Sequence, residues 1–372
     1  MIGSLLPLLL QQVPQAQAES RPVARVWFEN VSGRPMKGAI ARGNLPLPPT
    51  YSGPTPALTL AYGRRPLPTQ VTVLTTYPSA EPGALPGRPE IVELAARVDL
   101  PPFPGLALEV LPADRGPVET GPTPGPEIAR LLASKDPLLI RGTDVFGNVY
   151  EARVPLEKEP AEVFRRGPLL ETRIYASTMR PSGPGADASP ALPALWRVRA
   201  YVTLFAEEDF LLVDFLFHNG PVREDVLGPF YFRDLEVSAP EGWRFEVWKR
   251  EFGACGQERV EGGRVRLPVV PPLPDGKMHF VPDQACFTVR TALAAGSARE
   301  RALRFLGERP VFVPVPGGSL YSWSNPQTAR YDANKYPLPL VPQEIREEVR
   351  ARLTAEAEAV DAVPKEGGRG RG

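Results

Sequence analysis

Histidine and cysteine are nearly absent from this chain, which has two of each among 372 residues. Structural zinc sites usually take four ligands of these types at close spacing. Cys255 and Cys286 lie far apart in the sequence, and only His218 and His279 could join them. We therefore expect no metal site. Glycine pairs such as Gly262-Gly263 match no nucleotide-binding motif, so we expect no cofactor either.

An excess of either charge is also missing. The chain has 43 basic and 43 acidic side chains, so its formal net charge is zero. Nucleic-acid-binding proteins usually carry a clear basic excess on the surface that contacts phosphate. The sequence also has no apolar run of about 20 residues, the length that a membrane helix requires. We therefore expect neither a nucleic-acid partner nor a membrane span.

Proline, in contrast, is abundant, with 47 residues spread in short clusters between apolar segments. Because proline lacks a backbone donor and has a fixed φ, it interrupts helices and ends strands. The 42% of hydrophobic residues is still enough for ordinary globular cores. The pattern predicts a mostly β protein with many short strands and stiff loops. Such loops are typical of thermophile proteins, although a GC-rich genome gives the same bias.

The clearest structural signal is a β-hairpin at residues 196–219. Residues 196–205 alternate between two faces, as on a strand, and the polar residues 206–209 form the turn. The returning strand, residues 210–217, is apolar on both faces except at Asp214. A strand with two apolar faces is expected in the middle of a sandwich or barrel.

The other strand and turn signals divide the chain into five segments. Glycine and proline bound the strands of a first β domain, and a Gly-Pro-rich linker with a short helix at Glu127–Ser134 follows. Regularly spaced strands then predict a β-sandwich, followed by strands at Leu303–Leu306 and Val311–Val315. A helix with apolar residues every four positions begins at Pro342. The expected segments are a signal peptide or N-terminal arm (1–20), the first β domain (21–116), the linker (117–136), the sandwich (137–317), and an extension (318–372) with its helix at 342–360 and a disordered tail.

Part of the first domain resembles a known family. The segment Gly38–Pro48, which ends in Gly-Asn-Leu-Pro-Leu-Pro, is followed by strands at Leu58–Tyr62 and Gln70–Tyr77 and by an apolar strand ending at Leu100-Pro101. This order resembles the N-terminal RIFT-barrel region of the exo-rhamnogalacturonan-lyase-like (YetA-like) family, over roughly the first third of the chain. The resemblance implies a RIFT-like β-barrel. The family's α-helical toroid, which would hold a lyase site, has no counterpart in this sequence, so lyase activity is not implied.

The expected fold is therefore mostly β, a RIFT-like β-barrel followed by a β-sandwich, with a C-terminal extension that contains one helix. The first 18 residues allow two interpretations. Residues 5–10 form a short apolar core, and Ala16-Gln17-Ala18 resembles a signal-peptidase site. No basic residue precedes the core, so the segment could instead be an arm that docks on a neighbouring subunit. Export would favour a Cys255–Cys286 disulfide over two buried thiols.

Several polar residues could carry chemistry, and each has a structural alternative. Carboxylate pairs can catalyse glycoside hydrolysis, and four carboxylates lie near predicted strands: Asp209, Asp214, Asp234 and Glu236. Their alternative is exposed strand faces and turns. Asp214 interrupts an apolar face, so we expect a partner across the hairpin, Arg197 or Arg199. His218 could act as a base or lie at a loop edge, and His279 is expected to pack in a strand.

None of these sets forms a catalytic motif, and we predict no catalytic residue. The most distinctive binding candidates are four aromatic residues of the extension, because exposed aromatic side chains stack on sugars or anchor interfaces. They are Tyr321, Trp323, Tyr331 and Tyr336. The alternative is that this segment wraps over its own domain.

Two functions remain open at this point. The one we favour is a non-enzymatic structural or assembly module of a cell surface or a particle such as a phage virion, which binds protein partners or itself through its terminal arms. The alternative is a secreted carbohydrate-binding or polysaccharide-lyase-related protein. It rests on the family resemblance and the possible signal peptide, and it predicts binding of acidic glycans through aromatic or arginine contacts.

Overall fold

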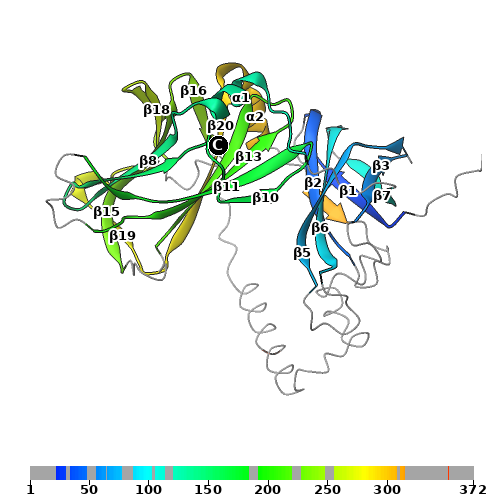
Figure 1. Ribbon diagram of the computed structural model, residues 1–372, viewed down its shortest axis with the longest axis horizontal. Helices are drawn as coiled ribbons and strands as arrows, with labels where there is room; N and C mark the ends of the chain where they lie inside the picture. Colours follow the sequence, from blue (N-terminus) through cyan, green and yellow to red (C-terminus); the bar gives the residue numbers. More distant parts are fainter. Residues whose placement is uncertain are drawn as a thin grey trace, which may run out of the picture.

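The computed structural model describes residues 22–30, 34–47, 56–63, 65–77, 87–102, 105–113, 120–183, 192–219, 228–247, 255–307, 311–314 and 351. These residues are mostly in strands, as the sequence predicted, and the paired strands are antiparallel. Within the described residues there are two α-helices, α1 (Pro126–Ala133) and α2 (Arg299–Gly307). Figure 1 shows two β-rich bodies, which we call the first unit (β1–β7 with β21) and the second unit (β8–β20 with α1 and α2).

The first unit consists of two sheets around one apolar core. A five-stranded sheet has the order β21-β1-β7-β3-β4, and a three-stranded sheet has the order β2-β6-β5. Buried residues of both sheets meet in a single cluster that includes Phe28, Leu60 and Leu94. In the described residues these sheets stay separate and do not close into a barrel. The strands are β1 (Ala24–Glu29), β2 (Met36–Pro46), β3 (Leu58–Tyr62), β4 (Arg65–Pro66), β5 (Thr69–Thr76), β6 (Pro89–Leu100), β7 (Leu106–Pro112) and β21 (Val311–Pro314).

The position of β21 corrects one sequence-based expectation. Val311–Val315 was assigned to the sandwich domain that ends at residue 317, but β21 pairs with β1 of the first unit, from Val26↔Pro314 to Glu29↔Val311. Without it, β1 would be an edge strand with unpaired backbone groups. Strand pairing over such a long sequence separation leaves no trace in local periodicity, so the boundary could not be read from the sequence.

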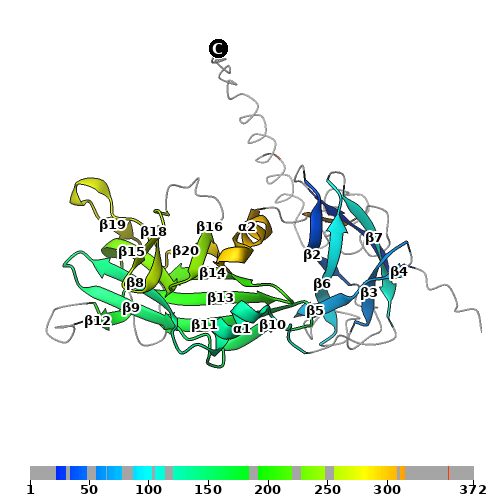
Figure 2. The same cartoon turned by 90° about the horizontal axis from the view of Figure 1, so that it is seen from above.

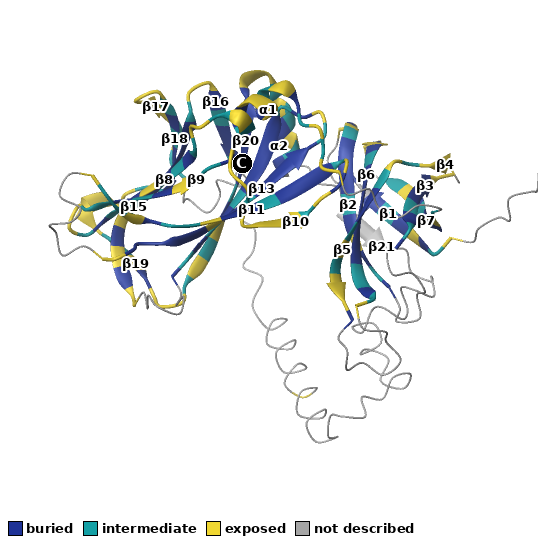
Figure 3. Cartoon of the chain, in the orientation of Figure 1, coloured by how far each residue is buried: buried dark blue, intermediate teal, exposed yellow. Residues whose placement is uncertain are grey.

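The second unit is a β-sandwich. One sheet has the order β12-β9-β8-β15-β18-β17, with β19 paired to β15, and the facing sheet has the order β10-β11-β13-β14-β20-β16. Apolar residues of both sheets form the largest core cluster, which Figure 3 shows as the dark interior of the larger body. The first sheet contains β8 (Leu138–Asp144), β9 (Val149–Val154), β12 (Arg180–Ser182), β15 (Phe230–Pro240), β17 (Arg259–Glu261), β18 (Arg264–Val270) and β19 (His279–Val281). The second contains β10 (Glu162–Arg165), β11 (Leu170–Thr178), β13 (Arg197–Phe205), β14 (Phe210–His218), β16 (Trp243–Val247) and β20 (Cys286–Ala295).

The predicted hairpin is confirmed as β13 and β14, which lie in the middle of their sheet. The two apolar faces of β14 pack in different clusters. Val213 and Phe215 enter the sandwich core, whereas Phe210 and Leu212 belong to a smaller cluster on the outer face. This smaller cluster also includes Ile40 of the first unit, so the second apolar face of β14 is the one that meets α2 and the neighbouring unit.

Of the two helices, the sequence predicted only α1. Leu303–Leu306 was expected as a strand, and this is wrong, because the segment lies in α2. The helix buries Ala302 and Leu306 on the outer face of the sandwich and exposes Leu303. An apolar run this short does not distinguish a strand from a helix face by periodicity alone. In Figure 2, α2 lies on the side of the second unit that is nearest to β2.

Some predictions fall outside the described residues. They are the N-terminal segment 1–20, the four aromatic binding candidates Tyr321, Trp323, Tyr331 and Tyr336, the helix at 342–360 except Ala351, and the C-terminal tail. Among the helices that the structure does describe, none has the length and apolar character needed to cross a bilayer.

Candidate functional site

A buried glutamine joins the two units. Gln70 of β5 is 2% exposed, and its Nε2 donates to the carbonyl oxygen of Leu170 at 3.0 Å. Its Oε1 accepts from the backbone N–H groups of Leu169 and Leu170 at 3.1 and 2.9 Å. Gly167 makes this approach possible, because a Cβ there would lie 2.3 Å from the Gln70 amide carbon. The amide therefore satisfies backbone groups at the start of β11 and fixes β5 against the second unit.

A second link is ionic and centres on Glu208, in the turn between β13 and β14. Its carboxylate is 5% exposed and binds Arg97 of β6 at 3.2 Å and Arg301 of α2 at 2.5 and 2.6 Å. Arg97 also donates to the carbonyl oxygen of Ala206 at 2.6 Å. The turn contains Glu207 at a positive φ of 62°. Glu208 thus ties the first unit, the hairpin and α2 together.

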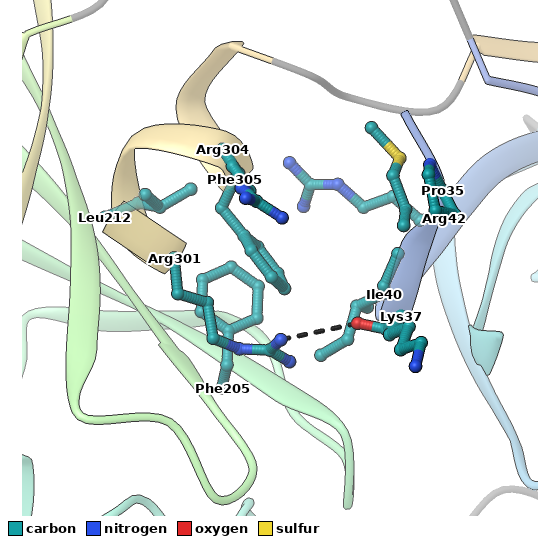
Figure 4. A pocket seen from close by; sticks show the side chains of 11 residues that line it. Pro35, Lys37, Ile40, Arg42, Phe205, Leu212, Arg301, Arg304 and Phe305 are labelled. Atoms are coloured by element: carbon teal, nitrogen blue, oxygen red, sulfur yellow. Dashed lines mark hydrogen bonds between the residues drawn. The ribbon is translucent and has the colours of Figure 1, made fainter. Parts of the chain in front are cut away.

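Beside this link lies a pocket with a volume of about 510 Å³, which we call the interunit pocket. One wall comes from β2 and the residue before it, and the other comes from β13, β14 and α2 (Figure 4). Its lining combines four cationic side chains with apolar ones, and the described residues that form it include no carboxylate. They are Pro35, Met36, Lys37, Ala39, Ile40, Arg42, Phe205, Leu212, Arg301, Arg304 and Phe305.

A bulge in β2 shapes the first wall. The pairing of β2 with β6 shifts register between Met36 and Ala39, and Gly38 has a φ of 58°, which glycine adopts without strain. A bulge re-aims the side chains beside it. As a result, Lys37 lines the pocket together with Ile40 and Arg42, although strict alternation would place it on the opposite face of the strand.

The second wall is aromatic and cationic. Phe305 of α2 packs against Phe205 and Phe210, with ring centroids 5.3 and 4.9 Å apart. The Arg301 guanidinium lies 5.4 Å from the Phe305 ring centroid and donates to the carbonyl oxygens of Lys37 and Gly38, both at 3.3 Å. The hydrogen bonds that Arg301 donates to Glu208, opposed by burial, raise the pKa of Arg301. The ring and the guanidinium are therefore held in place before any ligand arrives.

Each of the four candidate carboxylates has a structural partner. Asp209 caps α1, because its Oδ1 accepts from the N–H of Glu127 at 2.8 Å. Asp214 binds Arg290 of β20 at 2.6 and 3.0 Å, which corrects the expected pairing with Arg197 or Arg199. The remaining two are Asp234, which accepts from Thr143, and Glu236, which pairs with Arg259 and Arg266. Burial raises the pKa of Asp234.

Of the histidines and cysteines, His218 and Cys286 lie opposite each other on β14 and β20, whereas His279 and Cys255 lie on other segments. His218 ends β14, and burial followed by the charges of Arg197 and Arg199 lowers its pKa. His279 Nε2 lies 2.9 Å from the carbonyl oxygen of Pro271, and its ring packs on Phe232. The described part of the chain contains no group of three or more His, Cys, Asp or Glu residues able to hold a metal ion.

The candidate Cys255–Cys286 disulfide, which the sequence left open beside two buried thiols, is not formed in the structure. Cys255 packs near β18, with its Sγ 3.8 Å from the carbonyl oxygen of Val269, whereas Cys286 is exposed at the start of β20. These strands belong to opposite sheets of the sandwich.

A buried carboxylate close to the contact between the two units gives a pH-dependent prediction. Glu171 of β11 is 1% exposed and binds Arg166 at 2.9 Å and Arg173 at 2.5 Å. Burial alone would raise its pKa, but the two arginine hydrogen bonds outweigh burial and lower it. Because the folded-state pKa is below the unfolded one, this stabilisation is present above the unfolded pKa, about 4.3, and is lost as the pH falls through the folded value.

We therefore expect Glu171→Gln to lower the free energy of unfolding by about 1–3 kcal/mol at pH 7. The difference from the wild type should shrink as the pH falls below about 4. Urea unfolding at a series of pH values measures it. A difference that stays constant between pH 7 and pH 3 would contradict this role of the carboxylate.

Sequence reasoning missed the interunit pocket as a whole. Its residues come from sequence positions 35–42, 205–212 and 301–305, which only the packing of the two units brings together. One usable signal was the cationic and aromatic composition of residues 299–307, Arg-Glu-Arg-Ala-Leu-Arg-Phe-Leu-Gly. The expectation of a strand at Leu303–Leu306 concealed this signal, because Arg301, Arg304 and Phe305 share one face on a helix but not on a strand.

Comparison with known proteins gives no family for this chain. No family model and no curated protein matches it. The fold is similar to an α-mannosidase from Enterococcus faecalis V583, at 10% sequence identity and a TM-score of 0.42. It is also similar to a protein of glycosyl hydrolase family 38 from Enterococcus faecalis, at 10% sequence identity and a TM-score of 0.41. Each match covers 78% of this chain and 46% or 47% of the other, so this chain spans about half their length.

These matches correct the function that we first favoured. Both similar structures are named as glycoside hydrolases, and neither is a structural or assembly module of a virion or a cell surface. At this identity and TM-score, they give no activity or substrate to the present chain. The proposal below therefore rests on the interunit pocket alone.

Proposed function

We propose that this protein binds an acidic carbohydrate in the interunit pocket. The observation that carries the proposal is the lining, in which Lys37, Arg42, Arg301 and Arg304 share one pocket with the Phe305 ring. Guanidinium and ammonium groups bind carboxylates, and an aromatic face packs against the apolar face of a sugar ring. The volume of about 510 Å³ lies in the range of pockets that hold small ligands.

The first test compares ligands that differ only in charge. Calorimetric titration with a trimer of galacturonic acid and with a trimer of galactose is expected to give at least about tenfold tighter binding of the acidic sugar, or about 1.4 kcal/mol. Added salt should weaken that binding, because screening reduces attraction between charges near the surface. Equal affinity for both sugars, or binding of decanoate without binding of the uronate, would contradict the proposal.

A pair of phenylalanine variants locates the binding site. Phe305→Ala removes a ring that lines the pocket, and it should weaken binding of the galacturonic acid trimer by about tenfold or more. Phe280→Ala on β19 is the matched control, because this ring is 56% exposed and does not line the pocket. Thermal unfolding verifies that both variants are folded. Equal affinities in the two variants would place the sugar elsewhere.

A further inference from the structure

The four cations of the interunit pocket differ in how they are already paired. Arg301 is bound by Glu208, and Arg304 is bound by Glu300 at 2.6 Å on the surface of α2. Lys37 is exposed to solvent. Arg42 of β2 is half-buried, and in the described structure no hydrogen bond or ion pair engages its guanidinium. Arg42 is therefore the one partly desolvated guanidinium of the pocket that has no anion.

The charges around Arg42 do not compensate it. Two ion pairs lie within electrostatic range, Glu93 with Arg165 at 2.8 Å and Asp214 with Arg290 at 2.6 Å. Both carboxylates are thus already bound by another arginine, and Arg42 adds a third cation to two anions. Burial, reinforced by the charges of Arg165 and Arg290 and opposed by Glu93 and Asp214, lowers the pKa of Arg42. Arginine still remains protonated in proteins.

An uncompensated guanidinium in a partly buried position is costly unless a ligand supplies the anion. Figure 4 shows Arg42 extending from β2 across the pocket toward Arg304 and Phe305. Its planar fork can bind a carboxylate through two parallel hydrogen bonds. A sugar whose carboxylate reaches Arg42 can also place its ring beside Phe305, because both residues line the same pocket.

We propose that Arg42 binds the free carboxylate of a uronic acid residue, so that one ligand charge compensates the one partly desolvated guanidinium of the pocket that has no carboxylate partner in the described structure. This assignment rests on the proposed function and narrows it to a ligand with an unesterified carboxylate at this position. Arg304 attracts a carboxylate less strongly than Arg42, because it is 45% exposed and already has Glu300 as a partner. The requirement for a free acid is therefore a property of Arg42 and not of the overall positive charge.

The test uses the full chain, the galacturonic acid trimer and its methyl ester. The wild type is expected to bind the acid at least about 30-fold more tightly than the ester. Arg42→Gln should abolish this preference, and Arg42→Lys should restore part of it, since an ammonium keeps the charge but not the bidentate geometry. Arg153→Gln on β9 is the matched control, because this arginine is 70% exposed and does not line the pocket, and it should change the affinity for the acid less than about threefold.

A readout without ligand tests the charge imbalance itself. Removing an uncompensated cation should leave the melting temperature of Arg42→Gln equal to or higher than that of the wild type. A clear decrease would show that protein groups already compensate the charge, and it would overturn the assignment. Retained preference for the acid in Arg42→Gln would overturn the assignment while the proposed function stands. Absence of binding by the wild type would overturn both.

Discussion

Replacing Trp196 with alanine is expected to lower the free energy of unfolding by about 3–5 kcal/mol, the range found when large aromatic side chains are removed from cores. Trp196 is 1% exposed, and it contacts rings from both sheets of the sandwich edge-on, at centroid distances between 5.1 and 6.3 Å. Phe217 and Phe287 belong to one sheet, and Phe230 and Phe232 to the other. The alanine would leave a cavity where the two sheets meet.

The conservative variant makes this prediction specific to packing. The Trp196 Nε1 is buried without a hydrogen-bond partner in the structure, so Trp196→Phe removes an unsatisfied donor while it keeps most of the ring contacts. We expect it to cost less than half as much as the alanine. Urea unfolding followed by far-ultraviolet circular dichroism measures both. A loss below about 1 kcal/mol for Trp196→Ala would contradict the central position of this side chain.

The parts of the fold that were predicted correctly share a local signal. The hairpin β13–β14 was predicted because its alternation of apolar and polar residues is complete within 24 positions. The helix expected at Glu127–Ser134 is α1, which has a proline and an acidic residue in its first turn. In both cases, neighbouring residues in the sequence determine the structure. The central position of β14 also followed, since a strand with two apolar faces must be covered on both sides.

The parts that were missed depend on pairings over long sequence separations. Asp214 binds Arg290, which lies 76 positions away, and no local sequence pattern indicates that the two residues pair. The expected partners Arg197 and Arg199 were chosen because they lie on the adjacent strand β13, whereas the actual partner comes from β20 on the other side of β14. The interunit pocket depends in the same way on contacts between β2 and α2. Arg42 therefore had no feature in the sequence that distinguished it from the other arginines.

The second large effect is expected at Glu208, where glutamine should lower the free energy of unfolding by about 2–3 kcal/mol. Removing one partner of a fully buried ion pair costs about 3–5 kcal/mol, because the remaining charge is left without compensation. The effect is smaller here because Arg97 is 26% exposed and Arg301 is 39% exposed, so water can partly solvate them.

Glu300→Gln provides the matched control for Glu208→Gln, since it removes the same charge from the same region. Glu300 is 80% exposed and, among the described residues, pairs with Arg304 one turn along α2, so its loss should cost less than about 0.5 kcal/mol. Chemical denaturation of both variants at pH 7 gives the comparison. Similar losses would show that the carboxylate of Glu208 is solvated like a surface group. A large loss at Glu208 alone would show that the buried ion pairs of Glu208 stabilise the contact between the two units beside the interunit pocket. These ion pairs hold Arg301 in place, so that Arg42 is the guanidinium available to a ligand.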